Sequence, residues 1–383
     1  MAEKVFYLAR YARTENGELI NDGSLAATRK SDYIAQSIAK CGYEVEIVSV
    51  IRSRQKFRGL SPKKTIKLSE SVTLTESPSM GETGNPVLAK IRNIFSKAWL
   101  LMFMLVNIKK GDKVVIYHDY VYAPQILLAY RIKKFRAILE IEDIYQKVWD
   151  ISGKDVEREN RMLETFNNDC IVASDTIKSE LGISNAAVAY GNYKTYKGDI
   201  RKKGHGDKIK VICTGSIDRA RGIGLMAAEV ADKLNDEFQV LISGPITDDC
   251  REEFLNRIAE VNNSAGYEKC RYLGILNDED YEELLLDADI ALNPQKQGDF
   301  DKYVFPSKIL TYLGYNLDVV TTPGDSIVKS KVKEVLSVTK GYTIPDLVDE
   351  IEKVRFNRTR DYRDYLDAMN SEFVDEIHCL LED

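Results

Sequence analysis

The sequence predicts an α/β protein built from two doubly wound parallel-sheet domains. Short apolar strands alternate with amphipathic helices along the chain, a rhythm typical of βαβ units. The alternation stops at a charged, glycine-containing segment at about 194–210 and then starts again. A chain of 383 residues is also too long for one small core. Two domains joined by a linker are therefore expected.

The first half has the pattern of one such domain. Its expected strands are apolar runs at 4–9, 44–50, 113–118, 136–143, 169–174 and 187–192. Its expected helices have apolar residues at helical spacing and cover 26–42, about 87–108 and about 123–134. We expect the helix at 87–108 to belong mostly to the core. The stretch 51–86 is polar and basic, and we assign no helix or strand to it.

The second half repeats the pattern and ends in a helical tail. Its expected strands lie at 210–215, 238–244, 270–274, 289–294 and 318–322. Its expected helices lie at 224–235, 248–262, 278–287 and after Pro306. The predicted domains are 1–195 and 207–355, and we expect the strandless segment 356–383 to pack back on the first domain. Ligands of such sheets bind outside the carboxyl ends of the strands, here in a cleft between the domains.

The charge balance differs between the two halves. A net charge of −6 and a pI of about 5.5 argue against nucleic acid as a partner. Residues 1–195 hold 29 basic and 23 acidic side chains, a net +6, and the remainder holds 25 basic and 37 acidic, a net −12. The halves are therefore expected to face different partners. Six cysteines without metal-ligand or paired spacing are typical of reduced thiols in a cytoplasmic protein.

One basic stretch favours contact with a membrane surface. Seven cations and no acid fall within 52–67: Arg52, Arg54, Lys56, Arg58, Lys63, Lys64 and Lys67. We expect reversible contact of this stretch with an anionic membrane, at the inner face of the bilayer, and a solvated loop is the alternative. The longest apolar run, 98–106, is about half of what a bilayer span needs, so we expect no segment to cross a membrane.

The segment YVFPSKILTYLGYNLDVVTT, at 303–322, predicts an anion site. Pro306 suits the first turn of a helix, where its missing N–H has no partner to lose. Ser307 and the exposed N–H groups of that turn favour an anion, and Lys308 adds a full positive charge. A phosphate-bearing ligand is one interpretation, and an ordinary capped helix between two strands is the other.

Three segments together resemble a known family. CTGSIDRARGIGLM (213–226), YLGILNDEDYEELLLDADIALNP (272–294) and FPSKILTYLGYNLDVVTT (305–322) are similar to the nucleotide-sugar-binding domain of GT-B glycosyltransferases, most nearly the family-4 retaining enzymes of bacterial polysaccharide synthesis. The resemblance implies the GT-B fold, with two Rossmann-like domains. It also implies transfer of a sugar from a nucleotide diphosphate sugar, such as a UDP-sugar, to a hydroxyl of a glycan or lipid-linked oligosaccharide, with retention. No metal or other cofactor is expected.

The resemblance also assigns donor-binding residues. Gly215 and Arg221 match the strand-end glycine and the cation at the donor diphosphate, and Arg offers phosphate a fork of donors. Ser216 stands where the family often has a further arginine, and Arg219 could substitute for it. Ile275 and Leu276 match the turn that reads the nucleobase. Phe305, Pro306, Ser307 and Lys308 match the helix start over the diphosphate. Two glutamates of the family align with Tyr303 and Thr311, which is a departure from its pattern. In the first half, Gly23 and Ser24 match the glycine loop, although a plain turn explains them equally.

Four residues are candidates for catalysis. His118 ends a strand where family members place a histidine beside the donor sugar, and a structural histidine is the alternative. Glu142 and Asp143 end the next expected strand and could orient the acceptor hydroxyl, or else be solvated. Asp301 could take over the sugar contact of the missing glutamate. Two other functions stay open: a non-catalytic nucleotide-sugar-binding subunit of a partner enzyme, and a GT-B nucleotide-sugar epimerase.

Overall fold

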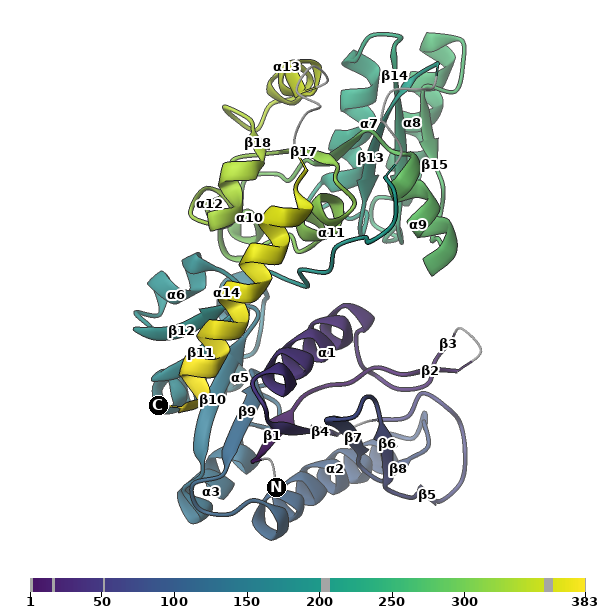
Figure 1. Cartoon of the computed structure of the whole chain (residues 1–383). Coiled ribbons are helices and arrows are strands. Elements are labelled where there is room, and N and C mark those ends of the chain that lie inside the picture. The colour runs from purple at the N-terminus through teal and green to yellow at the C-terminus, as the bar shows by residue number, and fades with distance from the viewer. Residues whose placement is uncertain (1–2, 16–17, 51, 201–206, 355–360, 383) are drawn as a thin grey trace. The chain divides into compact units, whose positions relative to one another are not determined.

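The chain folds into two compact units, each with its own parallel sheet (Figure 1). The computed structural model describes residues 3–15, 18–50, 52–200, 207–354 and 361–382. Unit 1 comprises the described residues of Met1–Ala173, Ile177–Ala189 and Glu372–Asp383, and unit 2 those of Ser174–Thr176 and Tyr190–Ser371. Part of the predicted linker, at 201–206, and the start of the predicted last segment, at 356–360, lie outside the described residues.

Unit 1 contains an eight-stranded sheet. Its strands, in spatial order, are β12 (Asn185–Val188), β11 (Asp169–Val172), β10 (Arg136–Ile141), β9 (Lys113–Tyr117), β1 (Lys4–Leu8), β4 (Glu44–Ser49), β7 (Val72–Glu76) and β6 (Lys64–Lys67). All pairs are parallel except β7 with β6. Two short antiparallel pairs stand apart: β2 (Thr14–Glu15) with β3 (Glu18–Leu19), and β5 (Leu60–Ser61) with β8 (Ser79–Met80).

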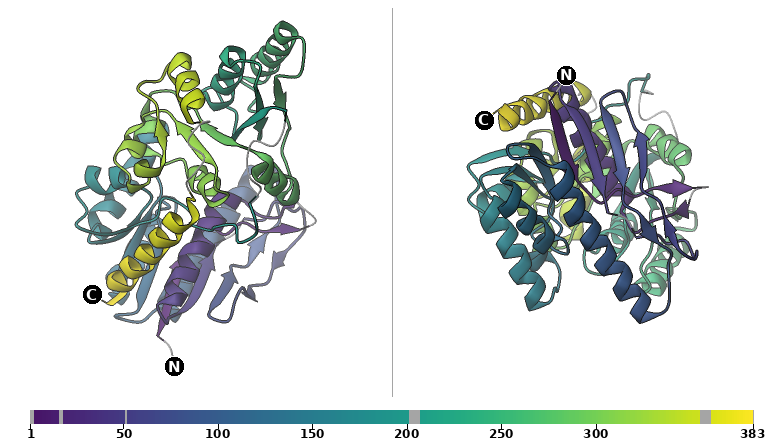
Figure 2. Two further views of the ribbon diagram at one scale, coloured as in Figure 1. Left: turned by 45° about the horizontal axis from the view of Figure 1, so that its top comes forward. Right: turned by 90° about the horizontal axis from the view of Figure 1, so that it is seen from below.

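Helices cover both faces of this sheet. They are α1 (Leu25–Lys40), α2 (Pro86–Asn107), α3 (Ala123–Lys133), α4 (Tyr145–Val148), α5 (Gly153–Phe166), α6 (Asp175–Glu180) and the end of α14 (Arg363–Glu382). Neighbouring residues of β1 point to opposite faces: Phe6 meets Phe103 of α2, with ring centroids 6.4 Å apart, whereas Tyr7 reaches Ser31 of α1. On the α1 side, Tyr33 stacks on Phe373 of α14. On the other side, α2 and α3 lie next to each other (Figure 2).

Unit 2 contains a six-stranded parallel sheet. Its spatial order is β15 (Cys270–Tyr272), β14 (Phe238–Ser243), β13 (Ile209–Thr214), β16 (Ile290–Asn293), β17 (Asp318–Thr321) and β18 (Ser337–Val338). Its helices are α7 (Ile223–Lys233), α8 (Arg251–Ala265), α9 (Asp278–Asp287), α10 (Asp299–Tyr303), α11 (Lys308–Gly314), α12 (Asp325–Val328), α13 (Ile344–Val354), the start of α14, and the 3₁₀ helix η1 (Lys331–Val335). Apolar residues of α7, α8, α13 and the inner strands form its core.

The predicted alternation and parallel sheets are confirmed, and two details differ. The stretch 51–86 contains strands, of which β7 is a buried parallel member of the main sheet. The helix α2 is only half in the core: Leu100 and Met104 are buried, whereas Val87 and Val106 are exposed. Pro86 at its start and the side chain of Asn85, which accepts from two backbone N–H groups, fix where α2 begins.

Candidate functional site

Each sheet has a point at which the strand order reverses, and there the loops diverge and leave room for a ligand. In unit 2 this point lies between β13 and β16, and Gly215 follows β13 directly. In unit 1 it lies between β1 and β9, which lead to Arg10 and His118 respectively. Gly215 and His118 therefore lie at the carboxyl ends of central strands of their own units, whereas Ile275 and Leu276 follow the edge strand β15.

Lys308 lies against the end of β13. Its Nζ donates to Oγ1 of Thr214 at 3.3 Å, and it sits 5.4 Å from the ring centroid of Tyr281. A Cβ added at Gly215 would lie 3.6 Å from Cε of Lys308, so the lysine stem runs alongside this glycine. The hydroxyl of Tyr312, one turn further along α11, accepts from the backbone N–H of Thr214 at 3.0 Å. Helix α11 has seven residues, and the Ser307 side chain makes no capping hydrogen bond.

Two glycines bring neighbouring strand ends close together. A Cβ at Gly244, which follows β14, would lie 1.8 Å from the carbonyl oxygen of Gly215. Both glycines have positive φ, 146° at Gly215 and 143° at Gly244, which side chains disfavour. The backbone N–H of Gly215 donates to the carbonyl of Ser243 at 2.9 Å. The chain therefore presents backbone without side chains beside Lys308.

The two predicted arginines have partners within unit 2. Arg221 donates to Asp218 through Nε at 2.8 Å and Nη2 at 2.5 Å, and its side chain is 34% exposed. Arg219 forms an ion pair with Glu253 of α8 at 2.5 Å and also donates to the carbonyl of Asp249. Arg219 is thus engaged on the α8 side. Arg221 keeps one guanidinium nitrogen, Nη1, without a hydrogen bond among the described residues.

The remaining donor candidates of unit 2 differ in exposure. Tyr303 and Phe305 are buried, and the Phe305 ring lies 4.9 Å from that of Tyr190. Ile275 is exposed, and the residues Ser216, Leu276, Pro306 and Thr311 are half-buried. The burial of Tyr303 indicates a packing role at the place where the family has a glutamate.

Asp301 is held by the protein itself. It is buried, and one carboxylate oxygen accepts from the backbone N–H of Gly298 at 2.6 Å. The other accepts from the hydroxyl of Tyr342, and the Asp301 carbonyl accepts from Ser326. These contacts fix the start of α10. The sugar contact suggested for Asp301 stays a prediction, and its carboxylate would have to exchange a partner to make it.

His118 is a buried imidazole without a hydrogen-bond partner. It follows β9, its side chain is 1% exposed, and neither ring nitrogen has a partner among the described residues. The nearest carboxylate oxygen, on Glu159, is 3.9 Å from Nε2 and accepts instead from the backbone N–H of Tyr145 at 2.6 Å. Burial lowers the pKa of His118 to about 4, so the ring is neutral at physiological pH. An unpaired buried polar group is costly, and a ligand hydroxyl would pair it.

Three carboxyl groups follow one another at the end of β10. Glu140 is buried and accepts from the hydroxyl of Tyr7 at 2.5 Å, and burial followed by the charge of Glu142 raises its pKa to about 8. Glu142 forms an ion pair with Lys30 of α1 at 2.6 Å. Burial, and then Glu142, raise the pKa of Asp143 to about 6. At pH 7 this strand end therefore holds a protonated acid beside an ion pair.

Gly23 and Ser24 begin α1. A Cβ at Gly23 would lie 2.6 Å from the backbone of Ala12, so the loop after β1 requires a glycine there. Ser24 is exposed at the N-cap position, and its side chain makes no capping hydrogen bond. Close packing thus explains why a glycine stands at position 23 without any ligand. The contact of Gly23 and Ser24 with a diphosphate stays a prediction.

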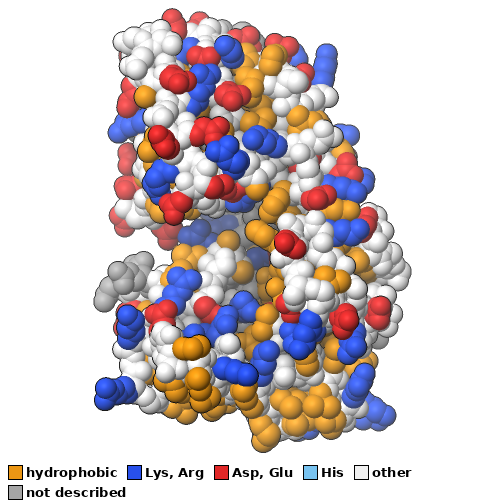
Figure 3. Space-filling model, turned by 180° about the vertical axis from the view of Figure 1, so that it is seen from behind, with side chains coloured by type: hydrophobic (Ala, Val, Ile, Leu, Met, Phe, Trp, Pro, Cys, Tyr) orange, Lys and Arg blue, Asp and Glu red, His pale blue; other side chains and the backbone are white. Residues whose placement is uncertain are grey.

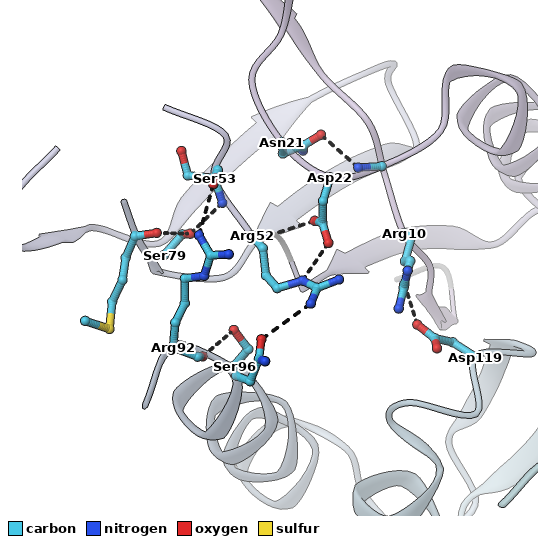
Figure 4. Close-up of polar contacts among 12 residues, drawn as sticks. Arg10, Asn21, Asp22, Arg52, Ser53, Ser79, Arg92, Ser96 and Asp119 are labelled. Carbon is cyan, nitrogen blue, oxygen red and sulfur yellow. Dashed lines mark hydrogen bonds and ion pairs between the residues drawn. The ribbon is translucent and has the colours of Figure 1, made fainter. Parts of the chain in front are cut away.

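A cavity at the switch point of unit 1 was not predicted from the sequence. It has a volume of about 30 Å³, and Leu8, Val48, Leu100 and Ile126 contribute its apolar wall. At its rim Arg10 donates to Asp119 at 2.5 Å, and Arg52 next to it donates to Asp22 at 2.6 Å (Figure 4). The sequence signal was present, because Arg10 directly follows a buried strand end and Asp119 directly follows His118.

Lys97 of α2 adds a cation near this cavity. Burial, and then the charge of Arg158, lower its pKa, and Asp119, Asp155 and Arg52 also act on it. The rim is thus a mixed cluster of cations and carboxylates in which Lys97 has no hydrogen bond or ion pair among the described residues. Across the described residues no group of three or more His, Cys, Asp or Glu side chains gathers in a way that could hold a metal ion.

Solved structures share this fold over their whole length. The similar structures include a trehalose-6-phosphate structure from E. coli bound with UDP-2-fluoro glucose, at 12% identity and a TM-score of 0.68, covering 100% of this chain and 99% of that one. Sucrose-phosphate synthase from Thermosynechococcus elongatus has 14% identity, a TM-score of 0.67 and coverages of 99% and 98%. The lipopolysaccharide outer core galactosyltransferase WaaB, in its apo form, has 10% identity, a TM-score of 0.60 and 99% coverage of both chains.

The chain therefore has the GT-B fold of glycosyltransferases, as the sequence predicted. No protein-family model matches the sequence, and no curated protein matches it significantly. At 10–14% identity the likeness shows the fold alone. Membership of family 4 stays a prediction.

Proposed function

We propose that the chain is a glycosyltransferase, which moves a sugar from a nucleotide diphosphate sugar to an acceptor hydroxyl. The observation that carries this is the position of Lys308 beside Gly215 and Thr214, at the switch point of the unit 2 sheet. There a diphosphate would meet a full positive charge and backbone without side chains, and Arg221 lies on the same loop as Gly215. The GT-B fold supports the same assignment.

The proposed reaction retains the configuration of the sugar and needs no strong protein base. The bond between the anomeric carbon and the diphosphate oxygen breaks, and a bond to the acceptor oxygen forms on the same face. The acceptor proton passes to a diphosphate oxygen. Lys308 and Arg221 would stabilise the charge that develops on the leaving diphosphate. His118 would pair with a sugar hydroxyl, and Glu142 or Asp143 would orient the acceptor.

The proposed acceptor is a glycan or a lipid-linked oligosaccharide, as in polysaccharide, capsule or O-antigen synthesis, and it would bind unit 1. The switch point of the unit 1 sheet supports this assignment, because ligands of doubly wound sheets bind there, and a small apolar cavity with charged groups at its rim marks the place. We propose that the protein works in the cytoplasm, at the inner face of the membrane, without a metal.

Binding of nucleoside diphosphates tests the donor site directly. We would titrate UDP, GDP and ADP by calorimetry into the wild type, Lys308→Met and, as a matched control, Lys353→Met, whose lysine is exposed on α13. A charge-assisted contact is worth about 1.5–3 kcal/mol, so Lys308→Met should weaken nucleotide binding roughly 10- to 150-fold. The control variant should bind the nucleotide like wild type. Equal affinities in all three proteins would refute the site.

A second candidate function rests on the buried Tyr303. The glutamates of the family that the chain resembles are absent there and at Thr311, which favours a non-catalytic nucleotide-sugar-binding subunit. A nucleotide-sugar epimerase is the third possibility. An assay with a nucleotide sugar that carries the nucleobase found to bind distinguishes the three functions. Release of nucleoside diphosphate, slow without acceptor, supports the transferase. Interconversion of the donor sugar without acceptor supports the epimerase, and binding without either reaction supports the subunit.

A further inference from the structure

The outward face of α2 carries a continuous apolar stripe. Val87, Ile91, Ile94, Met102 and Val106 are between 46% and 71% exposed. They follow one another at intervals of four, three, eight and four residues, which keeps them on one side of a helix. Because the opposite side of α2 packs on the sheet through Leu100 and Met104, the stripe faces away from the core of unit 1.

The neighbouring helix α3 extends this face. Leu128 and Ile132, one turn apart, are 45% and 57% exposed. Together α2 and α3 hold eight of the fourteen large apolar side chains that are exposed in the described residues. Figure 3 shows apolar side chains gathered in the lower part of the view, where these two helices lie. Singly scattered apolar residues need no explanation, but a concentration of this kind marks an interaction surface. We call it the α2–α3 face.

The segments that form the α2–α3 face and the basic stretch carry charges of one sign. The segments 52–67, 86–110 and 123–135 contain fifteen Lys and Arg residues and no Asp or Glu. Eleven of these cations are exposed: Arg54, Lys56, Arg58, Lys63, Lys64, Lys67, Lys90, Lys109, Lys110, Arg131 and Lys134. Two hydrogen bonds connect the first segment to α2, from Arg52 to Asn93 and from Arg92 to the carbonyl of Ser53 (Figure 4 shows the arginines). The basic stretch thus lies against the helix that carries the apolar stripe.

This combination selects one kind of occupant. A second copy docked on the same face would set one cluster of cations against an identical cluster, because a two-fold interface is self-complementary. An anionic bilayer offers acyl chains to the stripe and phosphate groups to the flanking cations. No helix in the described part of the chain is both long and apolar enough to cross a membrane. A surface position is therefore the geometry that α2 can adopt.

We propose that unit 1 docks on an anionic bilayer through the α2–α3 face, with α2 lying in the interfacial plane. The sequence had assigned membrane contact to 52–67 alone; the structure adds an apolar helix as its partner surface. The proposal does not rest on the glycosyltransferase assignment, because it concerns binding to lipid and no catalytic step. Its experiment requires no substrate, so either proposal can fail without the other.

Vesicle binding with matched variants tests the proposal. We would measure sedimentation of the full chain with phosphatidylcholine vesicles and with mixed phosphatidylcholine–phosphatidylglycerol vesicles at low salt. Wild type should bind the anionic vesicles at least about tenfold better. The triple variant Ile94→Ser, Met102→Ser, Val106→Ser should lose about tenfold or more, since it removes exposed apolar area without touching the core. The control Leu255→Ser, which changes an exposed apolar residue of α8, should bind like wild type.

Tryptophan fluorescence localises the contact. The chain has two tryptophans, Trp99 on α2 and Trp149 after α4, so a Trp149→Phe variant leaves one half-buried reporter on α2, packed on Phe103. Its emission should shift to shorter wavelength with anionic vesicles and be quenched by brominated lipid. Unquenched Trp99, equal binding to both vesicle types, or a triple variant that binds like wild type would overturn the proposal. A vesicle-independent dimer that the triple variant abolishes would overturn it in favour of a second copy.

Discussion

His118 is expected to titrate far below the ordinary range of histidine. Its imidazole is 1% exposed, so a charged ring would lose its hydration with only a backbone contact at Asp143 in return. This burial lowers the pKa from 6.5 to about 4, although a backbone contact at Asp143 acts in the opposite direction. We would therefore lower the pH from 7 to 4 and follow the protonation of His118 and the stability of the fold.

The magnitude follows from the size of this pKa difference. One pKa unit corresponds to about 1.4 kcal/mol, so lowering the pKa from 6.5 to about 4 makes protonation of the native state about 3 kcal/mol less favourable. Between these values the unfolded chain binds the proton and the native state does not, and stability therefore rises with pH. The stability that the protein gains from keeping His118 neutral is complete above pH 6.5. It is lost progressively as pH falls toward 4 and changes no further below that.

Proton NMR of the imidazole signals measures this pKa directly. The chain has three histidines, and a His118→Gln variant identifies the signal that belongs to His118. We expect its midpoint near 4 while the protein is folded. Chemical denaturation at pH 7 and pH 5 should show wild type losing stability relative to His118→Gln. A midpoint at 6 or above, or parallel stability curves, would refute the argument that burial controls this residue.

Three further predictions concern single substitutions. His118→Gln should lower turnover far more than it weakens nucleoside diphosphate binding, as steady-state kinetics and calorimetry would show, and unchanged turnover would make the ring structural. Gly244→Ala should lower the free energy of unfolding by about 3 kcal/mol or more, since its Cβ would meet the Gly215 carbonyl at 1.8 Å. The control Gly266→Ala has open space around it and should lower the free energy of unfolding by about 1 kcal/mol. Thermal unfolding measures both. As pH rises from about 4.5 to 8, wild type should lose stability, because burial keeps the Glu140 carboxyl protonated in the native state alone. Glu140→Gln has no carboxyl there and should not show this loss. Equal pH dependence of the two proteins would contradict the prediction.

The sequence predicted the fold well because strand–helix alternation is a local signal. Two residues of the proposed donor site also followed from local motifs: Gly215 follows a buried strand and Lys308 begins a helix, and the lysine stem runs alongside the glycine. Strand β7 was missed, although Val72 and Leu74 are buried, because the polar composition of the whole stretch 51–86 concealed a short alternating run.

Tertiary partners account for what the sequence could not predict. Arg219 was a candidate for the diphosphate, and Glu253, an ion-pair partner on another helix, engages it. Asp301 is buried by Tyr342, which lies 41 positions further along the chain. The helix α2 is apolar on both sides, and periodicity alone gives no way to tell which side the sheet covers. Such outcomes depend on packing between distant segments.

The two proposals use positive charge in different ways, and this resolves an apparent conflict with the composition. The second half of the chain has a net charge of −12, yet the proposed diphosphate site lies there. Charges in solvent are screened beyond about 8 Å at physiological ionic strength, so a bound diphosphate responds mainly to what it touches, including Lys308 at the end of β13. The α2–α3 face instead has many exposed cations beside it. Added salt should therefore weaken vesicle binding steeply and nucleoside diphosphate binding far less.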